Sequence, residues 1–404
     1  MKPVMPTPPP SPAARLRALK RHVWPAQQRY LATCAPGIED LLAVEVARLP
    51  EIDVLTRRTG AVAFAATFDT LYAALLRLRL AESLRVVLLH DVAAGSFPML
   101  FDQLQRFRWP LWLPDAAAVR LRVKSTKSRL RDEAGLERTL RRALEAAGLD
   151  ADATGAPPLT LHLHLHHDRA TVTLDAGGQL HRRSGDKWVS PTTIRETTAA
   201  ALCRLAGVGD PSRTADLIVD PFCGSGTVVL EALEALSGAA AGRRRGFPLE
   251  GSPAWKPERF AHARRLHGGA GAIEGSPPVL AFDADPAAVR ATNHNLEQWG
   301  YTATASATVT SAQNLDLQAL ARDHAAARPL LLANPPYGKG SQAAGTAPAD
   351  LLRTLLARAS GWDFALLYPR PEELEGLPAV TVREVRSLIT GGLRNAIVVG
   401  SAGH

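Results

Sequence analysis

Three short segments carry residues whose types and order could perform a reaction. The first reads Asp-Pro-Phe-Cys-Gly-Ser-Gly-Thr over residues 220–227, between an apolar run and a helical pattern. Gly224 and Gly226 allow a tight turn and a close ligand approach, and the next helix offers free N–H groups. The Asp220 carboxylate at the strand end would attract a cationic amino group, such as that of a methionine moiety. An ordinary strand-to-helix turn is the alternative.

The second segment is Phe-Asp-Ala-Asp-Pro over residues 282–286, directly after the next apolar run. At the carboxyl edge of a sheet, the Asp283 carboxylate can accept both hydroxyl protons of a ribose. Asp285 followed by Pro286 is typical of a helix N-cap, and Asp283 alone could also serve as one. We therefore assign Asp283 to a ribose and Asp285 to the cap.

The third segment, Asn-Pro-Pro-Tyr-Gly over residues 334–338, also follows an apolar run. Methylating an exocyclic amine is difficult because its lone pair is delocalised into the ring. The Asn334 side-chain oxygen and the Pro335 carbonyl could accept its N–H groups and stabilise the nitrogen as positive charge develops. Pro336 would stiffen the turn, and Tyr337 offers a ring on which a splayed base can stack. A proline-rich turn after a buried strand is the simpler alternative.

The three segments follow strands of what we expect to be a doubly wound, mostly parallel sheet. Several of these strands are unbroken apolar runs, as expected for strands covered on both faces. The predicted fold class is α/β, with a Rossmann-like domain over residues 181–404 and an insertion at 237–278. The expected strands lie at 217–219, 279–282, 307–309, 330–332 and 364–367, with a closing pair near Val380 and Ile397.

The preceding part of the chain predicts a smaller α+β region. Residues 29–95 alternate strands and helices, and residues 96–180 contain a strand, a basic loop, a helix and a hairpin. Residues 1–28 are rich in proline, hold no acidic residue and are expected to be a disordered arm, either solubilising or RNA-binding. Thr193 and Glu196 have capping-box spacing before a helix over 194–205.

His162, His164 and His166 fall on one strand face and raise the possibility of a metal site. No fourth ligand is evident, so we interpret them as a polar outer face and expect no metal. Cys34, Cys203 and Cys223 suggest neither a disulfide framework nor a zinc site, which favours a reducing cytoplasm.

Composition narrows the class of protein further. Of 404 residues, 46% are hydrophobic and 21% charged, which is typical of a globular protein, and the formal net charge is +8. No run of eighteen apolar residues exists, so we expect no membrane span. The positive charge favours a polyanionic partner.

On these residues the sequence resembles a known family. Residues 220–227, Asp283 and residues 334–338 are similar to the motifs of class I S-adenosylmethionine (SAM) methyltransferases acting on amino nitrogens. Residues 31–37, 124–130 and 174–183 resemble a THUMP module preceded by a ferredoxin-like domain, and residues 191–202 resemble the helix leading into the catalytic domain. The combination resembles the bacterial 23S rRNA guanine-N2 methyltransferases and the related tRNA enzymes.

The resemblance implies SAM as cofactor, RNA as partner and a set of site residues. The residues implied in cofactor binding are Asp220, Pro221, Phe222, Gly224, Ser225, Gly226, Thr227, Asp283, Ala284, Ser311, Ala312 and Asn334. Those implied at the target guanine are Asn334, Pro335, Pro336 and Tyr337. Those implied in RNA binding are Lys124, Lys127, Arg129, Arg131, Arg182 and Arg183.

Two departures from the family pattern concern the cofactor and the RNA. Residues 310–315 lack the acidic residue that usually lies near the adenine, so Ser311, a backbone amide or Gln313 would take that contact. Residues 183–188 replace the usual Arg-Gly-Tyr-Arg. Neither departure affects the transfer chemistry.

The expected function is therefore methyl transfer to guanine N2, in 23S rRNA or alternatively in tRNA. An adenine or cytosine amino methyltransferase on RNA or DNA stays open, because each of these bases presents an exocyclic amine. Methylation of a protein glutamine would leave the N-terminal half unexplained. A non-catalytic RNA-binding factor would predict the loss of one segment, and a nicotinamide oxidoreductase has no use for residues 334–337.

Overall fold

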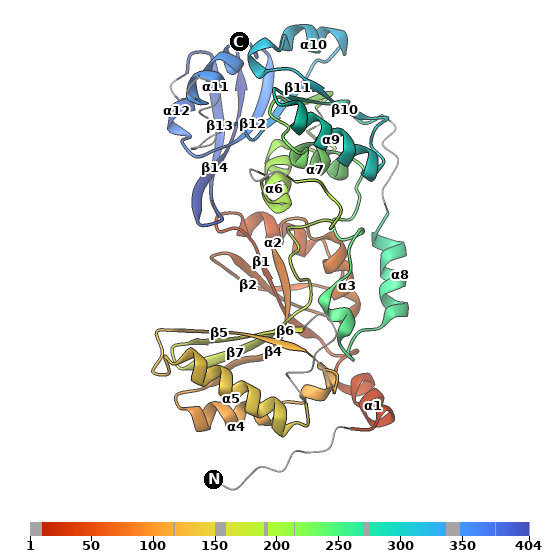
Figure 1. Ribbon diagram of the computed structural model, residues 1–404, viewed down its shortest axis with the longest axis vertical. Helices are drawn as coiled ribbons and strands as arrows, with labels where there is room; N and C mark the ends of the chain where they lie inside the picture. The colour runs from red at the N-terminus through yellow and green to blue at the C-terminus, as the bar shows by residue number, and fades with distance from the viewer. Residues whose placement is uncertain are drawn as a thin grey trace. The chain divides into compact units, whose positions relative to one another are not determined.

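The computed structural model describes residues 10–115, 118–149, 159–189, 193–213, 215–269, 275–336, 348–375 and 377–403 (Figure 1). The chain divides into two compact units. The N-terminal unit comprises Met1–Thr33, Ala43–Leu180 and Arg245–His267, and the C-terminal unit comprises Cys34–Leu42, His181–Arg244 and Gly268–His404. None of the described helices is both long and apolar enough to span a membrane.

The N-terminal unit is built on one sheet in the order β2-β3-β1-β4-β7-β6-β5. All neighbours pair antiparallel except β5 and β6, which are parallel. The sheet is continuous because β4 pairs with both β1 and β7. The strands are β1 Gln28–Thr33, β2 Asp53–Arg58, β3 Ala61–Ala66, β4 Ser83–Ala93, β5 Val119–Thr126, β6 Leu159–His166 and β7 Arg169–Asp175.

Helices cover one face of this sheet, and that face supplies the core. Leu161 and Leu163 of β6 are buried on it, as are Leu136, Leu140 and Leu144 of α5. Helix α2 Glu39–Ala47 is divided between the two units after Leu42. The other helices of the N-terminal unit are α1 Pro12–His22, α3 Phe68–Arg77, α4 Phe97–Gln105, α5 Glu133–Ala146 and α8 Pro257–His267, with short 3-10 turns η1 Trp109–Leu111 and η2 Pro248–Gly251.

The expectation of a disordered arm is wrong for Pro12–His22, which form α1. The Ser11 hydroxyl caps the helix by accepting from the Ala14 backbone N–H, and Leu19 and Val23 are buried. A cap and two buried apolar side chains stabilise this helix because it packs against the rest of the fold. The composition of residues 1–28 alone does not reveal that packing. Residues 1–9 lie outside the described part of the chain.

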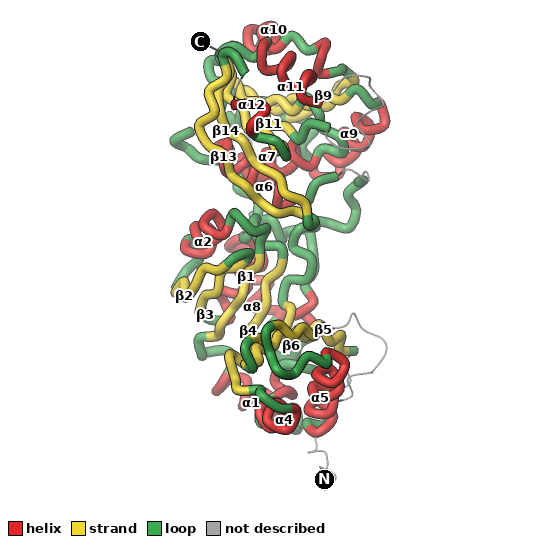
Figure 2. The backbone as a smooth tube through the Cα atoms, turned by 90° about the vertical axis from the view of Figure 1, so that its left-hand side faces the viewer, coloured by secondary structure: helices red, strands yellow, loops and turns green. Residues whose placement is uncertain are grey.

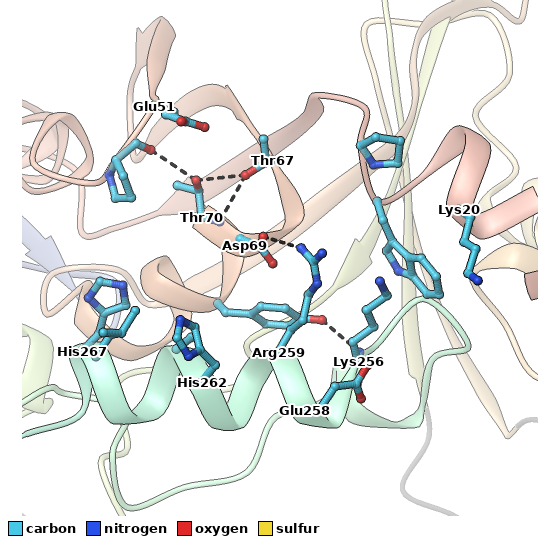
Figure 3. Close-up of a pocket in the computed structure, with 16 residues that line it drawn as sticks. Lys20, Glu51, Thr67, Asp69, Thr70, Lys256, Glu258, Arg259, His262 and His267 are labelled. Carbon is cyan, nitrogen blue, oxygen red and sulfur yellow. Dashed lines mark hydrogen bonds and ion pairs between the residues drawn. The ribbon is translucent and has the colours of Figure 1, made fainter.

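The expected insertion at 237–278 is divided, because Arg245–His267 group with the N-terminal unit. The Trp255 ring meets the Tyr72 ring edge-on at 4.8 Å, and the Phe260 ring lies 4.6 Å from the Trp255 ring. A cavity of about 910 Å³ lies beside this contact. Figure 3 shows Arg259 bridging to Asp69 there, with His262 and His267 on α8.

The C-terminal unit contains the predicted doubly wound sheet, in the order β10-β9-β8-β11-β12-β14-β13. β8, β9, β10, β11 and β12 are parallel, and β14 runs antiparallel to both β12 and β13. The α/β fold class is thereby confirmed. The strands are β8 Leu217–Asp220, β9 Val279–Asp283, β10 Ala305–Val309, β11 Pro329–Ala333, β12 Trp362–Tyr368, β13 Val380–Thr390 and β14 Leu393–Ala402.

Central strands β8 and β11 are buried along their whole length, as their apolar runs predict. The core includes Leu331, Phe364 and Val398. The helices are α6 Glu196–Ala206, α7 Thr227–Leu236, α9 Pro286–Trp299, α10 Leu317–Asp323, α11 Pro348–Ala357 and α12 Glu372–Glu375, with a 3-10 turn η3 Ala312–Asn314.

The β13–β14 hairpin packs tightly against residues 34–42 of the same unit. The Ile389 N–H donates to the Pro36 carbonyl at 3.0 Å, and Arg386 binds both oxygens of the Asp40 carboxylate at 2.8 and 2.9 Å. Gly37 has a φ of +109°, and a Cβ there would lie 2.0 Å from the Ser387 carbonyl oxygen. Only glycine fits this contact.

Gly37→Ala is therefore expected to reduce the free energy of unfolding by about 3–5 kcal/mol, from backbone strain and overpacking together. Gly391→Ala is the matched control, because Gly391 also has a positive φ (+59°) but no atom lies within 4 Å of the place that a Cβ would take. The control should lose only about 1–2 kcal/mol in urea unfolding. Equal losses for the two variants would contradict the steric argument.

Candidate functional site

The glycine segment forms the turn between β8 and α7. The Phe222 N–H donates to Asp220 Oδ1 at 3.0 Å, and the Cys223 N–H donates to the Phe282 carbonyl at 2.9 Å. Gly226 caps α7 with a φ of +77°, and a Cβ there would lie 2.9 Å from Thr292. Gly224, at a φ of +54°, borders open space instead, with no atom within 4 Å of the position of a Cβ. One glycine is thus fixed by packing, and the other lies where a ligand can approach.

Asp283, at the end of the neighbouring strand β9, is tied to this turn. Its Oδ2 accepts from the Gly224 N–H and its Oδ1 from the Asp285 N–H, both at 2.9 Å. Asp285 in turn caps α9 by accepting from the Ala287 N–H, as the sequence predicts. Both Asp283 oxygens keep a free lone pair, so the side chain can still accept hydroxyl protons from a ligand.

Two buried oxygens at this edge have no hydrogen-bond partner within the described part of the chain. They are Asp220 Oδ2 at the end of β8 and Asn334 Oδ1 directly after β11. Because β8 and β11 pair in parallel, with Val219 opposite Leu331, the two side chains follow adjacent strands at the same sheet edge. Buried acceptors without donors are rare in folded proteins, and this pair suits a ligand that supplies donors.

Burial raises the pKa of Asp220 to about 8, with the nearby charge of Asp283 adding to the shift. The carboxyl group is therefore mostly protonated at neutral pH until a cation approaches it.

The end of β10 completes the edge. Val309 pairs with Asp283, and the Thr310 N–H donates to the Asp283 carbonyl at 2.9 Å. The Ser311 hydroxyl caps η3, in which Ala312 is buried. The fold thus brings the predicted segments 220–227, 283–284, 311–312 and 334–336 to one edge of the sheet, whereas Tyr337 lies outside the described residues.

Residues 184–361 match the family model described as "RMKL-like, methyltransferase domain", and residues 29–86 match "RlmL ferredoxin-like domain". Residues 184–361 are therefore similar to the RMKL-like methyltransferase domain.

Curated relatives are named as RNA methyltransferases, and a solved structure shares the fold. The chain is 28% identical over 372 residues to "Ribosomal RNA large subunit methyltransferase K/L" of Syntrophotalea carbinolica, covering 85% of this chain and 49% of the relative. It therefore spans about half the length of the curated K/L relatives that it matches. It is 29% identical over 287 residues to "Putative RNA methyltransferase YpsC" of Bacillus subtilis, covering 67% and 70% of the two chains. SMU.472, described as a putative methyltransferase complexed with S-adenosylhomocysteine (SAH), has the same fold, with a TM-score of 0.79, 23% identity and coverage of 94% and 98%.

The C-terminal unit holds a buried charge network that was not predicted from the sequence. Arg183 Nε donates to Glu231 Oε1 at 2.8 Å, with side chains only 3% and 2% exposed. Lys187 Nζ donates to Thr227 Oγ1 at 2.6 Å and lies 3.4 Å from Glu196 Oε1. Burial lowers the pKa of Lys187, and Glu196 opposes that shift. The signal was present, because Glu231 and Glu234 interrupt an apolar helix, and a buried carboxylate needs a cation.

This network and its surroundings correct two sequence-based predictions for the C-terminal unit. Arg183 is not available to contact RNA, because its guanidinium group is buried on Glu231. Thr193 does not form a capping box, since its hydroxyl bonds the Ser225 hydroxyl at 2.9 Å and Arg195 occupies the N-cap of α6. Thr193 therefore supports the glycine turn rather than the helix.

The remaining basic residues predicted to bind RNA are exposed. Lys124, Lys127, Arg129 and Arg131 lie at and beyond the end of β5, and Arg182 precedes the RMKL-like match. Arg129 is also bound to Asp168, with 2.6 Å between Nε and Oδ2. Among the described residues no group of three or more His, Cys, Asp or Glu side chains could hold a metal ion.

Proposed function

We propose that the chain is a SAM-dependent RNA methyltransferase that modifies guanosine N2 in large-subunit ribosomal RNA. The observation that carries the proposal is the pair of buried, unsatisfied acceptors on Asp220 and Asn334 at neighbouring strand ends. One suits the cationic end of a cofactor and the other suits the N–H groups of an exocyclic amine. The ribosomal RNA methyltransferases among the relatives support the choice of substrate.

The residues at the sheet edge fit SAM. Asp220 Oδ2 would accept from the methionine ammonium, Asp283 from the ribose hydroxyls, and residues 311–312 would border the adenine. The open space at Gly224 leaves the backbone free to approach the ligand. The SAH in the SMU.472 structure, which has the same fold, is consistent with this arrangement.

When bound, the cofactor supplies an electrophilic methyl group on a sulfonium centre. The protein then has to position the target amine against that methyl group and stabilise the transition state of the transfer. Asn334 Oδ1 and the Pro335 carbonyl accept the two amine hydrogens, which orients the lone pair of the nitrogen and stabilises its growing positive charge. Tyr337 would stack on the base. The proton can leave after transfer, so no general base with an unusual pKa is needed.

The N-terminal unit would hold the RNA. We assign residues 29–95 to the ferredoxin-like domain and 96–180 to a THUMP domain, with Lys124, Lys127, Arg129, Arg131 and Arg182 contacting phosphates. Such contacts make binding salt-dependent. A cytoplasmic location fits a ribosomal RNA substrate.

The test is nucleoside mass spectrometry on ribosomal and transfer RNA, kept separate, from cells with and without the gene, followed by in vitro methylation with purified protein. Loss of N2-methylguanosine from large-subunit RNA, and its restoration in vitro, is the expected result. A loss confined to tRNA would mean that the substrate is tRNA. A change in methyladenosine would mean that the target base is adenine. No methyl transfer to any RNA would favour a non-catalytic binding factor.

Cofactor binding is expected to release a proton from Asp220. The free carboxyl group has a pKa of about 8, so about 0.9 of it is protonated at pH 7. Pairing with an ammonium group favours the ionised form, which lowers the pKa and expels that proton. Calorimetry of SAH binding at pH 7, in buffers of different ionisation enthalpy, should show close to one proton more released by wild type than by Asp220→Asn. Asp285→Asn, which changes a cap only, should behave as wild type, and equal release by all three proteins would refute the role of Asp220.

A further inference from the structure

The face of the N-terminal sheet opposite its helices has an unusual composition. Along β6, leucines are buried on the helical side, whereas His162, His164 and His166 alternate with them on the other side. The parallel pairing of β5 with β6 places Arg122 beside His162 and Lys124 beside His164. Figure 2 looks onto this face, on which strands β2, β3, β1 and β4 lie uncovered. A row of imidazole rings therefore runs beside a row of cations.

Cations from several strands converge on the histidine row. Burial lowers the pKa of His162 to about 4, and the charges of Arg85 on β4 and Arg122 on β5 lower it further. Burial also lowers the pKa of His164, and His166, Arg58 on β2 and Lys124 add to the shift. Every charged group that shifts these two pKa values is a base, although β2 and β6 are separated by four strands. The positive potential is thus shared across the face.

Arg85 adds a second, independent observation. Its Nε is buried and has no hydrogen-bond partner among the described residues, and burial lowers the pKa of the guanidinium group. The nearby Asp175 opposes that shift by its charge but makes no hydrogen bond to Arg85 Nε; its Oδ1 accepts from the Gly177 and Gly178 N–H groups. A buried cationic donor without an acceptor is costly unless an anion supplies one.

We propose that this face, defined by Arg58, Arg85, Arg122, Lys124, His162, His164 and His166, binds a single-stranded segment of the RNA substrate. Phosphates lie on the arginine and lysine side chains, and bases stack on the imidazole rings. The proposal rests on the proposed function for the identity of the RNA. An exposed sheet that carries flat rings is a platform suited to unpaired bases, and an acidic peptide would have no use for the rings. His164 and His166 are nearly parallel, at 22°, with centroids 5.9 Å apart.

The surface shares only Lys124 with the basic residues that the resemblance implies. Lys127, Arg129 and Arg131 follow β5, whereas Arg58, Arg85 and Arg122 lie within strands of the sheet. A segment of RNA on the sheet would therefore contact strands from both the 29–95 and the 96–180 parts of the chain.

The charge test is the double variant Arg58→Gln/Arg122→Gln, whose two exposed side chains come from opposite parts of the sheet. The probe is a fluorescein-labelled single-stranded RNA of about 20 nucleotides, followed by anisotropy from low to moderate salt. The Kd should rise at least about tenfold, and the slope of log K against log salt should fall by about 1.4, which corresponds to two lost phosphate contacts. The matched control Arg77→Gln/Arg265→Gln removes the same charge from exposed positions on α3 and α8 and should change the Kd less than about threefold.

The stacking test is His164→Ala/His166→Ala, which should weaken binding about tenfold and leave the salt slope unchanged, because stacking releases no counterions. His164→Phe/His166→Phe should restore the affinity. Equal weakening by the sheet variants and the helical control, or equal competition by polyglutamate of matched charge, would overturn the proposal. Thermal unfolding of each variant excludes loss of folding.

The experiments distinguish an error in the proposed RNA-binding face from an error in the proposed function. If wild type methylates ribosomal RNA but the sheet variants bind and methylate as wild type does, the surface is wrong and the activity stands. If the sheet variants lose RNA binding but wild type methylates no RNA, the surface stands and the activity is wrong.

Discussion

Asn334→Ala should lower the rate of methyl transfer by about 10²–10³, because it removes one of two acceptors that stabilise the transition state. SAM binding should change less than about twofold, since the side chain is proposed to act on the amine and not on the cofactor. Single-turnover methylation of large-subunit RNA measures the first quantity, and calorimetry measures the second. The effect is expected on the chemical step and not on the KM for RNA.

Asn334→Asp is the informative companion, because a carboxylate keeps an acceptor at the same position. A transfer rate in Asn334→Asp well above the residual rate of Asn334→Ala would support the acceptor role. Wild-type turnover in Asn334→Ala would refute it. A parallel loss of cofactor binding would instead place Asn334 in the cofactor site alone.

Arg183→Met is expected to reduce the free energy of unfolding by about 3–5 kcal/mol, because it leaves the Glu231 carboxylate buried and unpaired. The double variant Arg183→Met/Glu231→Leu should recover most of that loss, since an apolar pair of similar volume needs no compensating charge. Arg290→Met, at an exposed position of α9, is the control and should stay within about 0.5 kcal/mol of wild type.

Urea unfolding of these variants decides between two roles for Arg183. If Arg183→Met unfolds like wild type but loses RNA affinity, the role predicted from the sequence is right and the buried pair is not structural. The expected result is the reverse: lower stability, and an RNA affinity per folded molecule that does not change.

The fold of the C-terminal unit could be predicted because its strands leave a local pattern of apolar residues in the sequence. Central strands such as β8 and β11 are buried on both faces, so they appear as short apolar runs, and the polar residues directly after them had to meet at the carboxyl edge. The order of segments around Asp220, Asp283 and Asn334 therefore indicates a site from the sequence alone. Their individual roles remain predictions.

What the sequence did not reveal depends on contacts between distant segments. Nothing in the local pattern says that the Gly224 N–H is held by Asp283, or that Thr193 bonds Ser225. Arg183 was misassigned because a basic connector resembles a phosphate-binding surface until its acidic partner on α7 is known. Helix α1 was missed because its stabilising contacts lie elsewhere in the fold.

The grouping of Arg245–His267 with the N-terminal unit has a consequence for synthesis on the ribosome. The Trp24 indole N–H donates to the Ala254 carbonyl at 2.8 Å, the Lys256 N–H to the Tyr72 hydroxyl at 2.9 Å, and the Ser252 hydroxyl to the Trp112 carbonyl at 2.7 Å. The N-terminal unit thus needs residues that are translated well after its last strand, β7. At about 5–20 residues per second, the delay is roughly 5–20 s. During that interval residues 245–267 are not yet available to cover the aromatic surface around Tyr72. We therefore expect a chaperone to bind the nascent protein there.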